Sequence, residues 1–204
     1  MANFPNQTKY AGKTPVFWTE PSKVEVFGYK LSQSFPKGTV IAQGTPIYAD
    51  LSNGTAKICK IGKVVAKETT TKFHIAKGSL FAAGDKIMMS NSGGTPTLST
   101  ISSIDKSNAD YDLMTLSAAN SQLAAGSIIV EGVTTDGDTA PATLPNRLVA
   151  RECVVNGVAD TISACYNVVA IENTINIPVE YLNTTAFPGS KLLIGCPTIS
   201  FIKQ

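Results

Sequence analysis

A glycine-bracketed segment that occurs three times constrains the fold of this chain more than any other feature. The first copy runs from Lys37 to Tyr48, the second from Lys77 to Met88, and a shorter third copy covers residues 126–132. The shared order is a glycine, a small hydroxyl residue, two large apolar residues, two variable positions and a second glycine. The glycine pairs are Gly38 and Gly44, Gly78 and Gly84, and Gly126 and Gly132. Each pair would bracket a short apolar strand, which predicts architecture but supplies no nucleophile, base or metal ligand.

Short strand patterns separated by turn residues fill most of the chain. Residues 23–26 alternate with period two, as expected for a strand. The tetrapeptide at 35–38 fits a type I turn, and Asn53-Gly54 offers a tight hairpin turn. Residues 117–125 fit either a short helix or a turn-rich loop, and we find no amphipathic helix of four turns. Short strands at roughly ten-residue spacing predict a mainly β fold, a barrel or sandwich.

Four segments of different character divide the chain. Residues 1–22 contain three prolines among polar residues, so we expect an extended N-terminal arm whose aromatic side chains lie on its own domain or on a partner. Residues 23–133 form the β domain with the internal repeats. Residues 134–145, rich in Asp, Gly, Thr, Ala and Pro, predict a linker or long loop. Residues 146–204 are expected to form a C-terminal β subdomain packed on the first.

The charges are few and unevenly distributed. Charged residues make up 16% of the chain and apolar residues 43%, which indicates a globular protein and not a disordered one. Residues 1–80 carry a net charge of +7 and the remainder −5. This asymmetry suits an acidic partner, the acidic part of another copy, or a solvated lysine-rich sheet face. Because the first eighty residues contain no arginine, we expect no nucleic-acid partner.

The sequence also lacks the usual signals for membranes and secretion. Its longest apolar runs are only a few residues, too short to span a bilayer. The opening residues show no basic segment leading into an apolar stretch, so they do not resemble a secretory signal. We therefore expect no membrane partner.

Residue types that commonly carry catalysis are scarce. His74 is the single histidine, no partner pattern accompanies it, and no Gly-x-Ser-x-Gly motif is present. We expect His74 to be exposed and not catalytic. The cysteines are irregularly spaced, so buried free thiols are favoured over a zinc site. They are Cys59, Cys153, Cys165 and Cys196.

Two acidic clusters leave a cation site open. Asp105, Asp110 and Asp112 fall within eight residues, and Asp136 and Asp138 flank a glycine. Oxygen ligands in flexible loops suit calcium, but the spacing does not fit an EF-hand, and aspartates that cap their own turns explain both clusters more simply. A carboxylate pair assembled from distant strands would leave no local pattern, so an acidic enzyme site is not excluded. We predict no cofactor and no metal.

The repeats carry a family resemblance. The stretch Gly38 to Ile47, recurring at 78–87 and partly at 126–132, resembles the β-clip glycine pattern of small viral β proteins. Over residues 23–133 the chain looks like the head decoration and head fibre proteins of tailed bacteriophages, in particular lambdoid capsid decoration proteins. In those families a strand, a Gly-x5-Gly element and a further strand form a compact β unit, which sits as a trimer on the outside of the capsid.

The resemblance implies a structural virion protein that decorates or projects from a phage capsid. Its partners would be further copies, as a homotrimer, and the major capsid protein; it would be made in the host bacterial cytoplasm and reside on the capsid exterior. By the same resemblance the arm binds the capsid, with Tyr10, Phe17 and Trp18 as anchors. Because the sequence shows no catalytic motif, we expect that the protein is not an enzyme. Two alternatives remain: a carbohydrate-binding or adhesin-like β module, and a β-clip enzyme with an acidic site.

Overall fold

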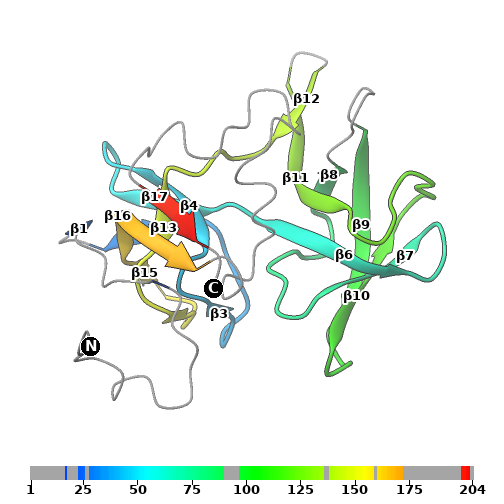
Figure 1. The fold of residues 1–204 in the computed structure, drawn as a ribbon, viewed down its shortest axis with the longest axis horizontal. Helices are drawn as coiled ribbons and strands as arrows, with labels where there is room; N and C mark the ends of the chain where they lie inside the picture. The colour runs from blue at the N-terminus through cyan, green and yellow to red at the C-terminus, as the bar shows by residue number, and fades with distance from the viewer. Residues whose placement is uncertain are drawn as a thin grey trace.

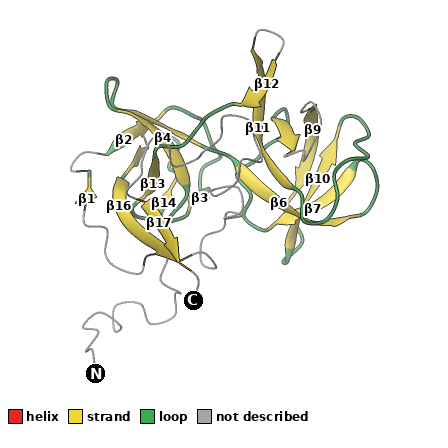
Figure 2. Ribbon diagram, turned by 45° about the horizontal axis from the view of Figure 1, so that its top comes forward, coloured by secondary structure: helices red, strands yellow, loops and turns green. Residues whose placement is uncertain are grey.

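The computed structural model of the chain consists of short strands in two lobes that lie side by side (Figure 1). The structure describes residues 17, 23–25, 28–89, 97–135, 138–158, 160–171 and 199–202. Over these residues it contains strands, turns and loops but no helix, as Figure 2 also shows. The mainly β class predicted from the sequence is therefore confirmed. The predicted arm, apart from Phe17, lies outside the described residues.

An open, mostly antiparallel sheet forms the first lobe. Strand pairing is antiparallel except between β2 and β5 and between β16 and β17, which are parallel. A separate two-stranded ribbon, β3 with β14, completes this lobe. In sheet order the strands are β1 (Lys23–Val24), β16 (Ala164–Ile171), β13 (Arg147–Val149), β4 (Pro46–Asp50), β5 (Thr55–Ile58), β2 (Tyr29–Leu31) and β15 (Thr161–Ile162), with β17 (Ile199–Ile202) on β16; the ribbon strands are β3 (Val40–Ile41) and β14 (Cys153–Val154).

The second lobe is a barrel of six antiparallel strands. Hydrogen bonding runs in the order β11, β6, β7, β10, β9, β8 and back to β11, so the ring has no free edge. A seventh strand, β12, pairs with the end of β11 and extends from the barrel as a hairpin (Figure 1). The strands are β6 (Ile61–Lys67), β7 (Lys72–Ala76), β8 (Lys86–Met89), β9 (Leu98–Asp105), β10 (Tyr111–Leu116), β11 (Ile128–Thr135) and β12 (Asp138–Pro141).

Alternating burial explains why these segments form strands. Along β10 buried residues alternate with half-buried ones, and β7 alternates in the same way. The inward side chains fill the barrel with a single apolar core, and the first lobe has two apolar clusters. The barrel core contains Val64, Phe73, Ile75, Phe81, Ile87, Ile101, Met114, Leu116, Leu123 and Ile129.

Most repeat glycines form tight turns. Gly44 has φ 81° and Gly84 has φ 90°, which is the left-handed conformation that a type II turn requires at its third position. The residue after each glycine donates its N–H to the carbonyl three residues back. The glycine N–H itself donates to a neighbouring strand, at 2.8 Å to Val149 and to Ile101 respectively. Gly38, Gly78 and Gly126 also have positive φ. The sequence pattern thus marks places where a turn is hydrogen-bonded to an adjacent strand.

Gly132 differs from the other repeat glycines. It lies inside β11 opposite Pro141 and is not in a turn. A Cβ added there would lie 2.6 Å from Leu98 Cδ2 and 3.0 Å from Met88 Cγ. Lack of a side chain, and not backbone conformation, is what the barrel needs at this position.

Several local expectations need correction. The turn expected at 35–38 is shifted by one residue, because Thr39 N–H donates to Pro36 O and Gly38 takes the third position with φ 87°. The hairpin after β4 uses the four-residue loop 51–54 and not a two-residue turn. Asp50, the last residue of β4, accepts backbone hydrogen bonds from this loop. Residues 117–125 form a loop, the second of the two expectations for them.

The sheets group the chain differently from the segments expected at sequence level. Strands from residues 23–58 and from residues 147–171 form the open sheet and the β3–β14 ribbon, whereas the strands β6 to β12 form the barrel and its hairpin. The expected linker at 134–145 includes β12. Composition cannot reveal this arrangement, because β13 inserts between β16 and β4, and β4 lies about a hundred residues earlier in the sequence.

Candidate contact surface

Three exposed valines belong to the β3–β14 ribbon and to the loop that follows it. Val40 and Val154 are direct cross-strand partners, and each is 48% exposed. Paired positions on neighbouring strands place their side chains on the same face. Val158, in the loop directly after β14, is 83% exposed. We call Val40, Val154 and Val158 the exposed valines.

Hydrogen bonds hold the framework around the exposed valines. Val155 N–H donates to Thr39 O at 2.9 Å, and Gly38 N–H donates to Val155 O at 2.8 Å. In the next loop, the carboxylate of Asp160 accepts the N–H groups of Asn156 and Gly157 at 2.8 and 3.0 Å. The loop therefore presents Val158 from a defined backbone conformation.

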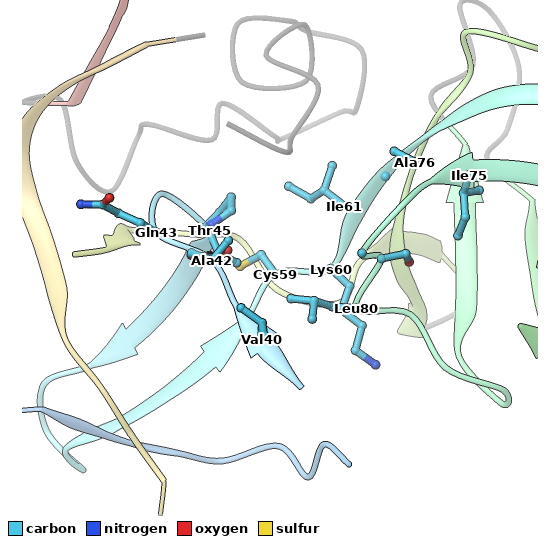
Figure 3. A pocket seen from close by; sticks show the side chains of 14 residues that line it. Val40, Ala42, Gln43, Thr45, Cys59, Lys60, Ile61, Ile75, Ala76 and Leu80 are labelled. Carbon is cyan, nitrogen blue, oxygen red and sulfur yellow. Dashed lines mark hydrogen bonds between the residues drawn. The ribbon is translucent and has the colours of Figure 1, made fainter. Parts of the chain in front are cut away.

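A small cavity lies where the two lobes meet. Val40, Ala42 and Pro46 of the first lobe line it together with Ile61 and Leu80 of the barrel, and Figure 3 shows side chains from both sides. Its volume is about 60 Å³. A water needs roughly 10–15 Å³ of such space, whereas ligand pockets usually have several hundred. The cavity thus has room for a few waters and not for a sugar ring or a nucleotide.

The first acidic cluster does not converge on a cation site. Asp112 is fully buried, and its Oδ2 accepts a hydrogen bond from Ser79 N–H at 3.0 Å. Its Oδ1 forms an ion pair with Lys77 Nζ at 3.1 Å, although the angles of this contact do not fit a hydrogen bond. Asp105 accepts Ser107 N–H at 2.9 Å, and the hydrogen bonds from Ser107 lower its pKa. A lysine ammonium therefore occupies the position beside the one buried carboxylate of this cluster.

The remaining acidic residues add no metal site. Asp110 is exposed, Asp136 lies outside the described residues, and only the backbone of Asp138 is described. Among the residues that the structure describes, no three His, Cys, Asp or Glu side chains gather closely enough to hold a metal ion.

His74 has structural partners on the barrel surface. Its ring stacks on Tyr111 with centroids 3.7 Å apart and an interplanar angle of 6°. Its Nε2 lies 2.6 Å from Glu68 Oε1. The side chain is half-buried by these contacts, so the expectation of an exposed histidine is wrong: the strand pairing of β7 with β10 places an aromatic neighbour beside it.

The cysteines that the structure describes are free thiols. Cys59 and Cys165 are buried and Cys153 is half-buried. Burial raises the pKa of Cys59, and a smaller degree of burial also raises the pKa of Cys153. Cys196 lies outside the described residues.

The three aromatic residues expected as capsid anchors fall in different places. Tyr10 and Trp18 lie outside the described residues. Phe17 is buried, forms an isolated β-bridge with Ala170 and packs in one of the two first-lobe clusters. Its side chain contributes to its own fold and is not offered to a partner.

Comparisons with protein-family models, with curated proteins and with solved structures found no match to this chain. Across the described residues there is no helix long and apolar enough to cross a membrane. The geometry of the chain itself must therefore support any functional conclusion.

Sequence reasoning did not find the exposed valines. Val40 and Val154 lie in strand patterns, and alternation alone does not tell which face is outward. The exposure of Val158 could have been predicted, because it is an apolar residue inside the turn sequence Asn156-Gly157-Val158-Ala159-Asp160. An apolar side chain between turn-forming residues has no strand neighbour to cover it.

Proposed function

We propose that this chain is a structural virion protein that decorates or projects from the outer surface of a phage capsid. It acts through protein–protein contacts, with the major capsid protein as partner. The observation that carries the proposal is the set of exposed valines on a hydrogen-bonded ribbon, together with the resemblance of the glycine repeats to head decoration and head fibre proteins.

The exposed valines support a contact function on energetic grounds. Burying one valine side chain completely is worth about 1.5–3 kcal/mol, and these three are about half exposed or more. Covering all three against a partner would thus contribute roughly 3–5 kcal/mol before the costs of association. A contact of that strength suits a protein bound in several copies, where one linked assembly engages several sites at once.

A closed trimer is part of the proposal, because three copies would present three such surfaces. Light scattering on the purified chain tests it. A mass about three times 21.5 kDa supports the trimer, and a mass of one chain would remove the trimer while leaving the contact surface in place.

The N-terminal arm also remains a proposed contact, with Tyr10 and Trp18 as anchors. Deleting residues 2–16 removes Tyr10 and spares the buried Phe17. We expect the shortened chain to fold and to be retained more weakly on capsids. Unchanged occupancy would remove the deleted residues from the contact.

Co-sedimentation with expanded capsids tests the contact surface. Val154→Asp and Val158→Asp place a charge where an apolar contact is proposed, and we expect each to weaken retention at least tenfold, about 1.4 kcal/mol. The matched control is Val65→Asp on β6, which is 57% exposed and belongs to the barrel. Equal retention of all three variants would contradict the proposal, provided that their circular dichroism matches the parent chain.

A further inference from the structure

Lys60 lies between two carboxylates at the joint of the two lobes. It follows β5 and directly precedes β6, so the chain passes from the first lobe into the barrel at this residue. Its Nζ is 2.7 Å from Asp85 Oδ2 and 3.7 Å from Glu131 Oε1. Glu131 belongs to β11, which pairs with both β6 and β8, and Asp85 immediately precedes β8. The strand with the glutamate thus runs between the elements that bring the lysine and the aspartate.

The three charged groups are largely withdrawn from water. The side chains of Lys60, Asp85 and Glu131 are only 9%, 15% and 19% exposed. The ring of Phe35, from the first lobe, has its centroid 5.9 Å from Lys60 Nζ. Glu131 Oε2 is buried without a hydrogen-bond partner among the described residues. Two carboxylates around one ammonium leave an excess negative charge here, and poor solvation favours chemistry that removes charge.

We propose that Lys60 and Asp85 condense to a side-chain amide, with Glu131 as the proton carrier. Glu131 accepts a proton from Nζ and passes it to a carboxylate oxygen of Asp85, and the free amine then attacks Cγ of the neutral carboxyl group. The Cγ–O bond of one carboxylate oxygen then breaks, and that oxygen leaves as water with the two protons that the nitrogen has given up. One ammonium and one carboxylate become one amide and one water, so no oxidant, cofactor or activating group is consumed.

The geometry favours this step over a simple ion pair. Near-attack arrangements place reacting atoms roughly 3–3.5 Å apart, and Cγ lies one bond beyond an oxygen that is already 2.7 Å from Nζ. Asp85 is held in place because Ala82 N–H donates to the same Oδ2 at 2.8 Å. Groups fixed in this way can reach effective concentrations of about 10⁵–10⁸ M, which offsets the tendency of water to hydrolyse an amide.

The bond would fix the point at which the chain enters the barrel. It closes a covalent loop from Lys60 to Asp85 and ties the chain entering β6 to the turn before β8. This assignment does not depend on capsid binding, and its test is separate from the tests of that function.

Intact mass spectrometry of the purified, denatured full chain tests the proposal. We expect the parent chain to be lighter than the mass of its sequence by one water molecule, and the Lys60→Arg variant to have the full mass of its own sequence. Digestion should yield a branched peptide containing Lys60 and Asp85. Glu131→Gln should restore the unmodified mass, and Asp85→Asn should lose ammonia in place of water.

A second lysine–aspartate contact gives the matched control. Lys77 Nζ lies 3.1 Å from Asp112 Oδ1, and we expect Lys77→Arg to keep the full loss of water. The proposal is overturned if the parent chain has its unmodified mass after prolonged incubation, or if the loss persists in Lys60→Arg. The parent mass decides the question even where a variant fails to fold.

Discussion

Adding one methyl group at Gly132 tests how the repeat glycines work. In Gly132→Ala the new Cβ would lie 2.6 Å from Leu98 Cδ2 and 3.0 Å from Met88 Cγ. Carbon atoms pack best about 3.5–4.0 Å apart, so the substitution overpacks the barrel. Met88 is buried, which limits relaxation on its side, whereas Leu98 is half-buried and its nearest atom to the new group is a terminal methyl. We expect a loss of about 1–3 kcal/mol in the free energy of unfolding.

Gly126→Ala, in the same repeat copy, should destabilise for a different reason. Gly126 has φ +88°, and an added Cβ there would meet nothing within 4 Å. The expected cost of about 1–2 kcal/mol therefore comes from the left-handed backbone alone. Leu98→Ala separates the two causes. It should rescue Gly132→Ala with a coupling energy of about 1 kcal/mol, because it removes the clashing Cδ2, and it should add to Gly126→Ala without coupling.

Urea unfolding followed by far-ultraviolet circular dichroism measures these energies. The slope of the free energy with urea should stay constant across the set, which shows that the variants unfold the same surface. The reasoning is refuted if Gly132→Ala changes stability by less than about 0.5 kcal/mol, the usual range for a harmless surface change, or if Leu98→Ala fails to rescue it.

Three further outcomes are expected. Burial, together with the hydrogen bond to a carboxylate, raises the pKa of Tyr29 from 10.0 to about 12. Because Tyr29 loses its proton at a lower pH in the unfolded state than in the folded state, the free energy of unfolding should fall as pH rises from about 10 to about 12. Tyr29→Phe should flatten this part of the plot of unfolding free energy against pH. Lys77→Met leaves the carboxylate of Asp112 buried without its cation and should lower the free energy of unfolding in urea by about 2 kcal/mol. Breaking a fully buried pair costs roughly 3–5 kcal/mol, and the loss here is smaller because Lys77 is partly exposed. Combining Lys77→Met with Asp112→Asn should restore most of the lost stability. A thiol reagent should label Cys153 before the buried Cys59, and equal labelling rates in the folded protein would contradict the burial described for Cys59.

Local signals in the sequence were sufficient for the class of fold. Positive-φ glycines at turns and alternating apolar residues are properties of a few adjacent residues, so Gly44, Gly84 and the alternation of β7 could be interpreted directly. Gly132 could not, because its role depends on Leu98 and Met88 from other strands. The same glycine spacing thus concealed two different physical causes.

Long-range pairing set the limits of prediction for the domains and the site. Closure of the barrel depends on β11 contacting both β6 and β8, and no pattern within one strand reveals two partners. The exposure of Val40 and Val154 follows from which face of the ribbon is covered, which alternation leaves open. The cluster around Lys60 joins residues up to seventy-one positions apart, from Lys60 to Glu131, and the repeat copies that contain Asp85 and Glu131 give no sign that both meet Lys60.

Hydrogen–deuterium exchange of the full chain, alone and bound to expanded capsids, tests the central claim most directly. If the protein works by contact through the exposed valines, the capsid should slow exchange at residues 38–42 and 153–158 and leave the barrel strand β7 unchanged. Protection confined to the barrel, or no protection anywhere at saturating capsid, would contradict the account.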